Sequence, residues 1–84
     1  MSAQNDFQSA TVPNEIVNLA FDNAWSSARA WREYLNLTQT AVAKRMKVTR
    51  STLAKFETSG ARLRKATREK LAAALGLTSD QLAW

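Results

Sequence analysis

The segment that most constrains the fold is 37–57, with the sequence LTQTAVAKRMKVTRSTLAKFE. It holds two short helical patterns, QTAVAKRM after Thr38 and RSTLAKFE after Thr49, and both threonines predict N-caps. The joint between them, MKVT, contains neither glycine nor proline. A chain that reverses in so few residues usually needs a residue with positive φ, and we expect that residue to be Lys47. The two patterns and their short joint predict a helix-turn-helix. Its turn should be mildly strained, because a non-glycine residue in that conformation costs about 1 kcal/mol.

The faces of the two patterns agree with this prediction. Helices that cross steeply need a small residue where their backbones approach, and Ala43 occupies that place. The apolar side chains predicted to face the core are Val42, Met46, Val48, Leu53 and Phe56. The outward face of the second pattern is polar and consists of Arg50, Ser51 and Lys55, with Ala54 between them.

Positive charge is concentrated around this segment. Residues 44–70 carry ten Lys or Arg and two acidic residues, a net charge of +8. The rest of the chain carries two basic and five acidic residues, a net charge of −3. Such a charge step within one domain indicates a basic face that meets a polyanion, although a merely solvated surface is the alternative. The position of the charges relative to a motif has to decide between the two.

Several classes of protein are excluded by composition. The 84-residue chain has no cysteine and no histidine, and its seven carboxylates are scattered rather than paired. It therefore lacks disulfides, thiolate metal sites and the usual nucleophile and base arrangements of enzymes, so we expect no catalytic residue, no metal and no cofactor. No apolar run approaches the ~18 residues of a membrane span, and the N-terminus lacks the features of a signal peptide. The sequence predicts a cytoplasmic protein.

The rest of the chain also predicts helices, and no alternation of period two predicts a strand. Residues 1–11 predict a disordered arm. Residues 12–25 predict an amphipathic helix whose apolar face consists of Val17, Ala20, Phe21 and Ala24, flanked by Ile16 and Trp25. Residues 26–84 predict a single domain. Because every predicted element is a helix, the predicted fold class is all-α.

Within that domain, capping residues mark three more helices. We expect Ser26 or Ser27 to cap a helix over 28–36, with Trp31 and Tyr34 facing inward. A basic loop over 58–66 precedes a helix over 68–75, capped by Thr67 and ended by Gly76. Thr78 and Gln81 predict a capping box for a last short helix over 79–84.

These residues resemble the Xre/Cro-type, lambda-repressor-like family of DNA-binding domains. The resemblance covers residues 28–83 and rests on WREYLNLTQTAVAKRMKVTRSTLAKFETSG followed by LAAALGLTSDQL. It implies a five-helix domain that contains a helix-turn-helix, here preceded by an extra N-terminal helix. In this family the positions of Arg32 and Glu57, on either side of Gln39, form a partly buried ion pair.

A narrower resemblance extends over residues 12–83. The segments VPNEIVNLAFDNAWSSARAWREYLNLTQ and RLRKATREKLAAALGLTSDQL are similar to antitoxins encoded beside RelE/ParE-type toxins. It implies an antitoxin that neutralises such a toxin and represses its own operon.

The helix-turn-helix predicts which residues meet DNA. The helix that begins at Arg50 should enter the major groove, where base edges are distinguishable. We expect base contacts from Arg50, Ser51, Ala54 and Lys55, with Arg50 and Lys55 as the main readers. Phosphate contacts are expected from Gln39, Lys44, Lys47, Thr49, Thr52, Arg62, Arg64 and Lys65. One of the loop arginines, Arg62 or Arg64, is a candidate for the minor groove instead.

Protein partners are predicted more coarsely. Binding to two half-sites on DNA normally requires a dimer. We expect the contact between its subunits to consist of Leu77, Leu82 and Trp84. Packing of Trp84 in the core of its own subunit is the alternative. Phe7, Ile16, Phe21 and Trp25 are candidates for a toxin contact, unless the leading helix only caps the domain.

Three hypotheses of function follow. The first is a dimeric antitoxin, and the second is a stand-alone phage- or plasmid-type repressor without a toxin. The third is an adaptor that keeps the fold and binds only proteins, against which the basic second helix of the motif argues. The operator sequence, the half-site spacing and the identity of any toxin are left open.

Overall fold

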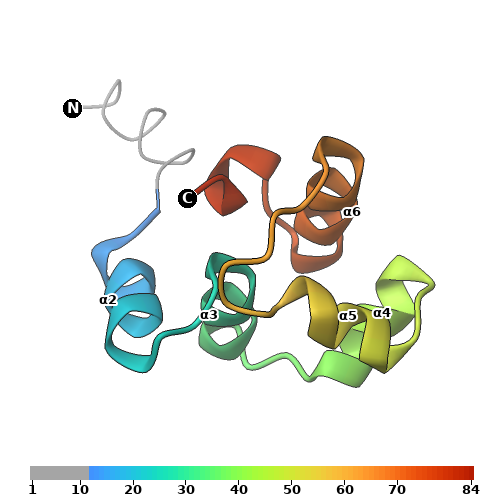
Figure 1. Cartoon of the computed structure of the whole chain (residues 1–84), viewed down its shortest axis with the longest axis horizontal. Coiled ribbons are helices and arrows are strands. Elements are labelled where there is room, and N and C mark those ends of the chain that lie inside the picture. Colours follow the sequence, from blue (N-terminus) through green and yellow to red (C-terminus); the bar gives the residue numbers. More distant parts are fainter. Residues whose placement is uncertain (1–11) are drawn as a thin grey trace.

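The computed structural model describes residues 12–84, which form α-helices joined by short loops (Figure 1). The elements are α2 (Asn14–Asn23), α3 (Ser27–Tyr34), α4 (Gln39–Met46), α5 (Arg50–Phe56), α6 (Lys65–Leu75) and the 3₁₀ turn η1 (Ser79–Leu82). No strand occurs in this part of the chain, and the predicted all-α fold is confirmed. The arm predicted over 1–11, with Phe7, lies outside the described residues. No helix within 12–84 is long and apolar enough to cross a membrane.

The predicted caps at the start of α3, α4 and α5 are confirmed. Each is a side-chain hydroxyl that accepts a hydrogen bond from the backbone N–H three residues later. The three donor–acceptor pairs are Arg29 to Ser26 (3.1 Å), Ala41 to Thr38 (3.0 Å) and Thr52 to Thr49 (3.1 Å). Local hydrogen bonds thus fix where these helices begin.

The turn between α4 and α5 reverses without a glycine. Lys47 adopts the left-handed conformation, with φ 59° and ψ 41°, as the sequence predicts. Its N–H donates to Lys44 O at 3.1 Å, and the N–H of Val48 donates to Ala43 O at 3.0 Å. These bonds satisfy the last carbonyls of α4, and α5 then lies beside α4 (Figure 1).

The last two elements differ in part from prediction. Gly76 ends α6 in the left-handed region, as expected, with φ 75°. The cap assigned to Thr67 is wrong, because α6 begins at Lys65, three residues before the predicted start, and Thr67 lies in its first turn. The final helix is a single 3₁₀ turn, whose start is held by the Thr78 N–H donating to Gln81 Oε1 at 2.9 Å.

The core lies between α3, α4, α5 and α6, and α2 covers it from the side of α3 (Figure 1). Among the predicted core residues of the motif, Val42, Ala43, Met46 and Leu53 are buried, whereas Val48 and Phe56 are half-buried. Trp31 is buried as predicted. Tyr34 was expected to face inward and is exposed instead, since it is the last residue of α3 and meets Trp31 only edge-on.

The buried face of α2 is one position away from the predicted one. Ile16 and Ala20, four residues apart, are buried, whereas Phe21 is 88% exposed and Val17 is 39% exposed. The helix ends at Asn23 because Ala24 takes a left-handed conformation, with φ 56°. Since α2 packs mainly on α3, only a narrow stripe of it is covered, and the apolar residues beside that stripe stay in contact with solvent.

The C-terminal segment is tied back onto α3. The indole N–H groups of Trp31 and Trp84 both donate to the carbonyl oxygen of Gln81, at 2.8 Å and 2.7 Å. Ser27 Oγ donates to Leu82 O at 3.2 Å, and the side chain of Leu82 is buried in the core. Leu82 is 5% exposed and so offers little area of its own to the dimer contact predicted for it.

Candidate DNA interface

The outward face of α5 carries the residues predicted to read bases. Leu53 is fully buried and anchors the helix to the core. On the opposite side Arg50, Ser51 and Lys55 are exposed, and Ala54 is half-buried between them. A short helix with a polar, basic outer face matches in size and charge the major groove of B-form DNA. None of the four candidate base-reading residues is used in the core.

A hydrogen-bonded series leads from the core to this face. Arg32 donates from Nε to Glu57 Oε2 at 2.6 Å and from Nη2 to Glu57 Oε1 at 3.0 Å. Both residues are buried, with 7% and 6% of their surfaces exposed. Arg32 Nη1 also donates to Leu37 O at 2.8 Å, so the pair connects α3, the α3–α4 loop and the end of α5. Bidentate geometry and an extra carbonyl partner are what a buried ion pair requires in order not to destabilise a fold.

Gln39 continues the series to the surface. Its Nε2 donates to Glu57 Oε1 at 3.1 Å, and its Oε1 accepts from Arg50 Nε at 3.3 Å. Gln39 was predicted as a phosphate contact, and within the protein its amide is already bonded at both ends. Its expected role is therefore to orient Arg50, while the start of α4 leaves the backbone N–H groups of Gln39 and Thr40 for a phosphate.

The two threonines predicted to contact phosphate differ in their free protons. Thr49 Oγ1 accepts from the Thr52 N–H as the cap of α5 and donates to Thr52 Oγ1 at 2.8 Å. Thr52, having accepted that bond, keeps its own hydroxyl proton for an outside acceptor. Thr52 is thus the better placed of the two to bind a phosphate oxygen through its side chain.

The basic residues predicted to contact phosphate are all exposed. They are Lys44, Lys47, Arg62, Arg64 and Lys65. Lys47 lies on the turn directly before α5, and Lys44 lies in the last turn of α4. Arg62 and Arg64 belong to the loop that follows α5, and Lys65 is the first residue of α6. The charges therefore flank α5 at both of its ends.

Sequence reasoning missed three features of this region. Thr40, Asn36 and Arg29 line a hollow beside Gln39 and Arg50, next to the start of α4. Arg29 is held there by Glu33, at 3.4 Å, and by the Trp25 ring, 4.6 Å from its Cζ. The Arg29–Glu33 ion pair could have been predicted from the sequence, because residues four apart lie on the same face of a helix.

The remaining predicted site residues lie elsewhere. Trp84 is 44% exposed, and Leu77 is half-buried against the core. Phe21 is exposed, and Trp25 is half-buried at the join of α2 and α3. Ile16, also predicted as a toxin contact, is fully buried.

Helices α4 and α5, with their capped starts and left-handed joint, define a helix-turn-helix domain. A family model described as a helix-turn-helix domain matches residues 28–84, from α3 to the C-terminal segment. The chain belongs to this family and to the class of DNA-binding regulators that it defines. Comparison with curated proteins and with solved structures gave no match. Helix α2 precedes the matched residues.

Proposed function

We propose that the protein is a dimeric repressor that binds operator DNA through α5, and that it acts as the antitoxin of a RelE/ParE-type toxin whose operon it represses. The observation that carries the proposal is the series from the buried Arg32–Glu57 pair through Gln39 to Arg50. An exposed guanidinium held in place at the start of a recognition helix is suited to donate two hydrogen bonds to guanine. A solvated arginine without such a support would have to be ordered when it binds.

The short recognition helix α5 is the reason to propose a dimer. One helix of seven residues contacts only a few base pairs, so specific affinity normally needs two half-sites about one helical turn apart. Trp84 and Leu77 are the candidates for the contact between subunits. Trp84 supports this role because its ring is fixed by the bond to Gln81 O and still exposes 44% of its surface.

The toxin contact is assigned to the exposed side of α2. Phe21 is the most exposed large apolar residue of the described part of the chain, and Val17 lies one turn before it on the same side. A phenylalanine that is 88% exposed buries little surface in its own subunit, whereas its burial against a partner would be worth about 1.5–3 kcal/mol. Phe21 and Trp25 are therefore the residues with which a toxin would be mapped first.

Co-purification and DNA binding together test the proposal. The tagged chain is expressed with the product of the neighbouring gene, and the eluate is used in a shift assay on the upstream DNA. We expect a small basic protein to co-purify and the DNA to shift. A shift without a co-purifying partner identifies the stand-alone repressor, and the absence of any shift rejects DNA binding through α5.

A further inference from the structure

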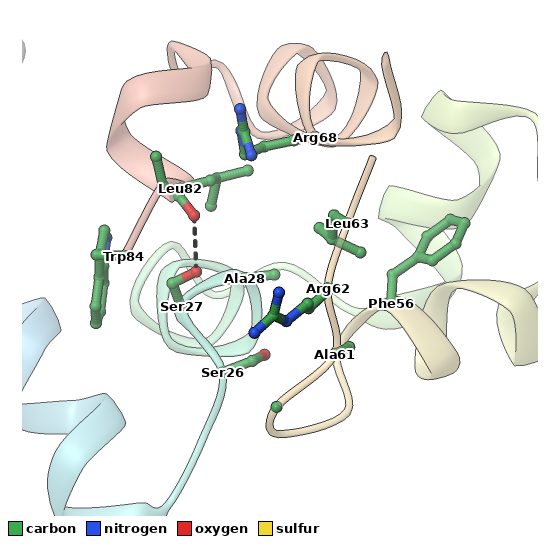
Figure 2. A pocket seen from close by; sticks show the side chains of 12 residues that line it. Ser26, Ser27, Ala28, Phe56, Ala61, Arg62, Leu63, Arg68, Leu82 and Trp84 are labelled. Carbon is green, nitrogen blue, oxygen red and sulfur yellow. Dashed lines mark hydrogen bonds between the residues drawn. The ribbon is translucent and has the colours of Figure 1, made fainter. Parts of the chain in front are cut away.

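A pocket of about 450 Å³ lies beneath the loop that follows α5, away from the start of the recognition helix (Figure 2). Its walls come from the start of α3, the end of α5, the loop 60–63, Arg68 of α6 and the C-terminal segment. A volume of this size is within the range of pockets that bind small ligands, about 300–1,000 Å³. It shares Arg62 with the predicted DNA contacts, but none of the four candidate base-reading residues lines it.

The pocket combines apolar walls with positive charge. Its large apolar residues are Phe56, Leu63, Leu82 and Trp84. Arg62 reaches it from the loop and Arg68 from α6, as Figure 2 shows. Within the described part of the chain, no aspartate or glutamate lines it. The ion pairs formed among the described residues include neither of these two arginines.

Arg68 is the more informative of the two. Its Nε is buried and has no hydrogen-bond partner among residues 12–84. A buried donor without a partner costs about 1–3 kcal/mol, and a charged one costs more, so a small shift of the Arg68 side chain toward an acceptor in the pocket would be favourable. The unpaired donor indicates that a ligand of this pocket would carry a hydrogen-bond acceptor.

The two serines of the pocket form no hydrogen bond with Arg68. They also offer no free proton to a ligand, so the two arginines are the main hydrogen-bond donors of the pocket. Ser26 Oγ donates to Glu57 O at 2.8 Å, and Ser27 Oγ donates to Leu82 O at 3.2 Å. Both hydroxyl protons are therefore already used within the fold. An anion in the pocket would be bound by the two guanidinium groups.

We propose that this pocket binds a carboxylate carried on an apolar frame, with the carboxylate on Arg68 and Arg62 and the frame against Trp84 and Leu63. Arginine matches the planar, two-oxygen geometry of a carboxylate. The apolar walls favour a ligand with an aromatic or branched body over a small, strongly hydrated anion such as phosphate. The site shares Arg62 with the predicted DNA contacts and Trp84 with the predicted dimer contact. Its test uses neither DNA nor a toxin, so it can fail while the proposed function holds.

The test is an NMR titration of the full chain, labelled with ¹⁵N, at constant ionic strength. The probes are benzoate, as a free carboxylate, and N-acetyl-aspartyl-phenylalanine amide, as the same chemistry in a peptide. We expect saturable shifts of the Arg68 Nε–H and Trp84 indole N–H signals with at least one probe. Tighter binding of benzoate identifies a small molecule as the source, and tighter binding of the dipeptide identifies an acidic protein segment.

Controls separate binding at this site from general effects. Benzyl alcohol lacks the charge, and inorganic phosphate lacks the apolar frame, so neither should reproduce the saturable shifts. Arg68→Gln should weaken binding about tenfold, whereas Lys70→Gln removes a charge from the same helix outside the pocket and should leave it unchanged. Arg62→Gln, in the exposed loop, serves if Arg68→Gln unfolds the chain. No saturable shift with either probe, or unchanged binding in both arginine variants, overturns the proposal.

Discussion

Gln39 and Glu57 are joined by a hydrogen bond of 3.1 Å, from the side-chain amide at the start of α4 to the buried carboxylate at the end of α5. Arg32 holds the same carboxylate from α3, and Gln39 in turn holds Arg50 on the surface. One carboxylate therefore fixes the relative positions of three helices and, through Gln39, the first residue of the recognition helix. Substitutions along this series should separate effects on stability from effects on DNA reading.

Arg32→Ala should strongly destabilise the fold. It leaves the carboxylate of Glu57 buried without its bidentate partner, and breaking a buried pair in this way costs about 3–5 kcal/mol. Urea denaturation followed by circular dichroism measures the loss. Arg29→Ala is the matched control, because it removes only a partly exposed ion pair with Glu33 and the contact with the Trp25 ring, which together should contribute less than about 2 kcal/mol. Equal stabilities of the two variants would show that the buried pair does not stabilise the domain.

Gln39→Ala should reduce sequence discrimination more than stability. The variant removes the support of Arg50 and one of several bonds to Glu57, so we expect a loss of about 1 kcal/mol in unfolding free energy. The ratio of specific to random DNA affinity should fall because Arg50 then has to be ordered on binding. Thr40→Ala, at the exposed neighbouring residue, is the control for general changes at the start of α4. A ratio that stays at the wild-type value in Gln39→Ala rejects the positioning role.

Arg50→Ala should cost about 1–3 kcal/mol on the operator and relax the preference at one base pair. Fluorescence anisotropy with operator and random duplexes of equal length measures both effects. Lys44→Ala is the comparison, since a phosphate contact should weaken binding to the two duplexes equally. Loss of equal size on random DNA in Arg50→Ala would mean that Arg50 contacts the backbone instead.

Affinity for DNA should fall steeply with salt. Each phosphate neutralised contributes about −0.9 to the slope of log affinity against log salt concentration. The expected slope for Lys44→Ala is therefore less steep than that of the wild type by about one such unit. The slopes are measured between low and physiological salt on the same duplex. A flat response of the wild-type protein would contradict a DNA interface around α5.

Local signals in the sequence account for most of the fold. Thr38, Thr49 and Gly76 could be predicted because caps and left-handed ends are set by hydrogen bonds within a few residues. Phe21 was misplaced because periodicity shows that a helix has an apolar face, but not how much of that face its neighbours cover.

The site was predictable to a lesser degree. The outer face of α5 follows from the motif, whereas the bonds of Gln39 to both Glu57 and Arg50 depend on where three helices meet. The pocket that holds Arg62 and Arg68 has no local signature, since its walls come from segments far apart in the sequence. Leu82 and Trp84 are two residues apart, yet Leu82 packs in the core while Trp84 stays 44% exposed and is bonded to Gln81 O, a difference that depends on how the C-terminal segment folds back.

Lys47→Gly should stabilise the protein and weaken its binding to DNA. Lys47 has φ 59°, and relief of that conformation is worth about 1 kcal/mol or slightly more, of which the greater flexibility of glycine offsets a part. A net gain of about 0.5 kcal/mol raises the melting temperature by roughly 2–4 °C in a domain of this size. Because the variant also removes an exposed charge beside α5, affinity should fall equally for operator and random DNA. Ala24→Gly, at φ 56°, is the control that relieves a similar conformation without a change of charge, so it should stabilise the fold and leave DNA affinity unaltered. A lower melting temperature for Lys47→Gly would mean that interactions of the lysine side chain outweigh the strain of its backbone.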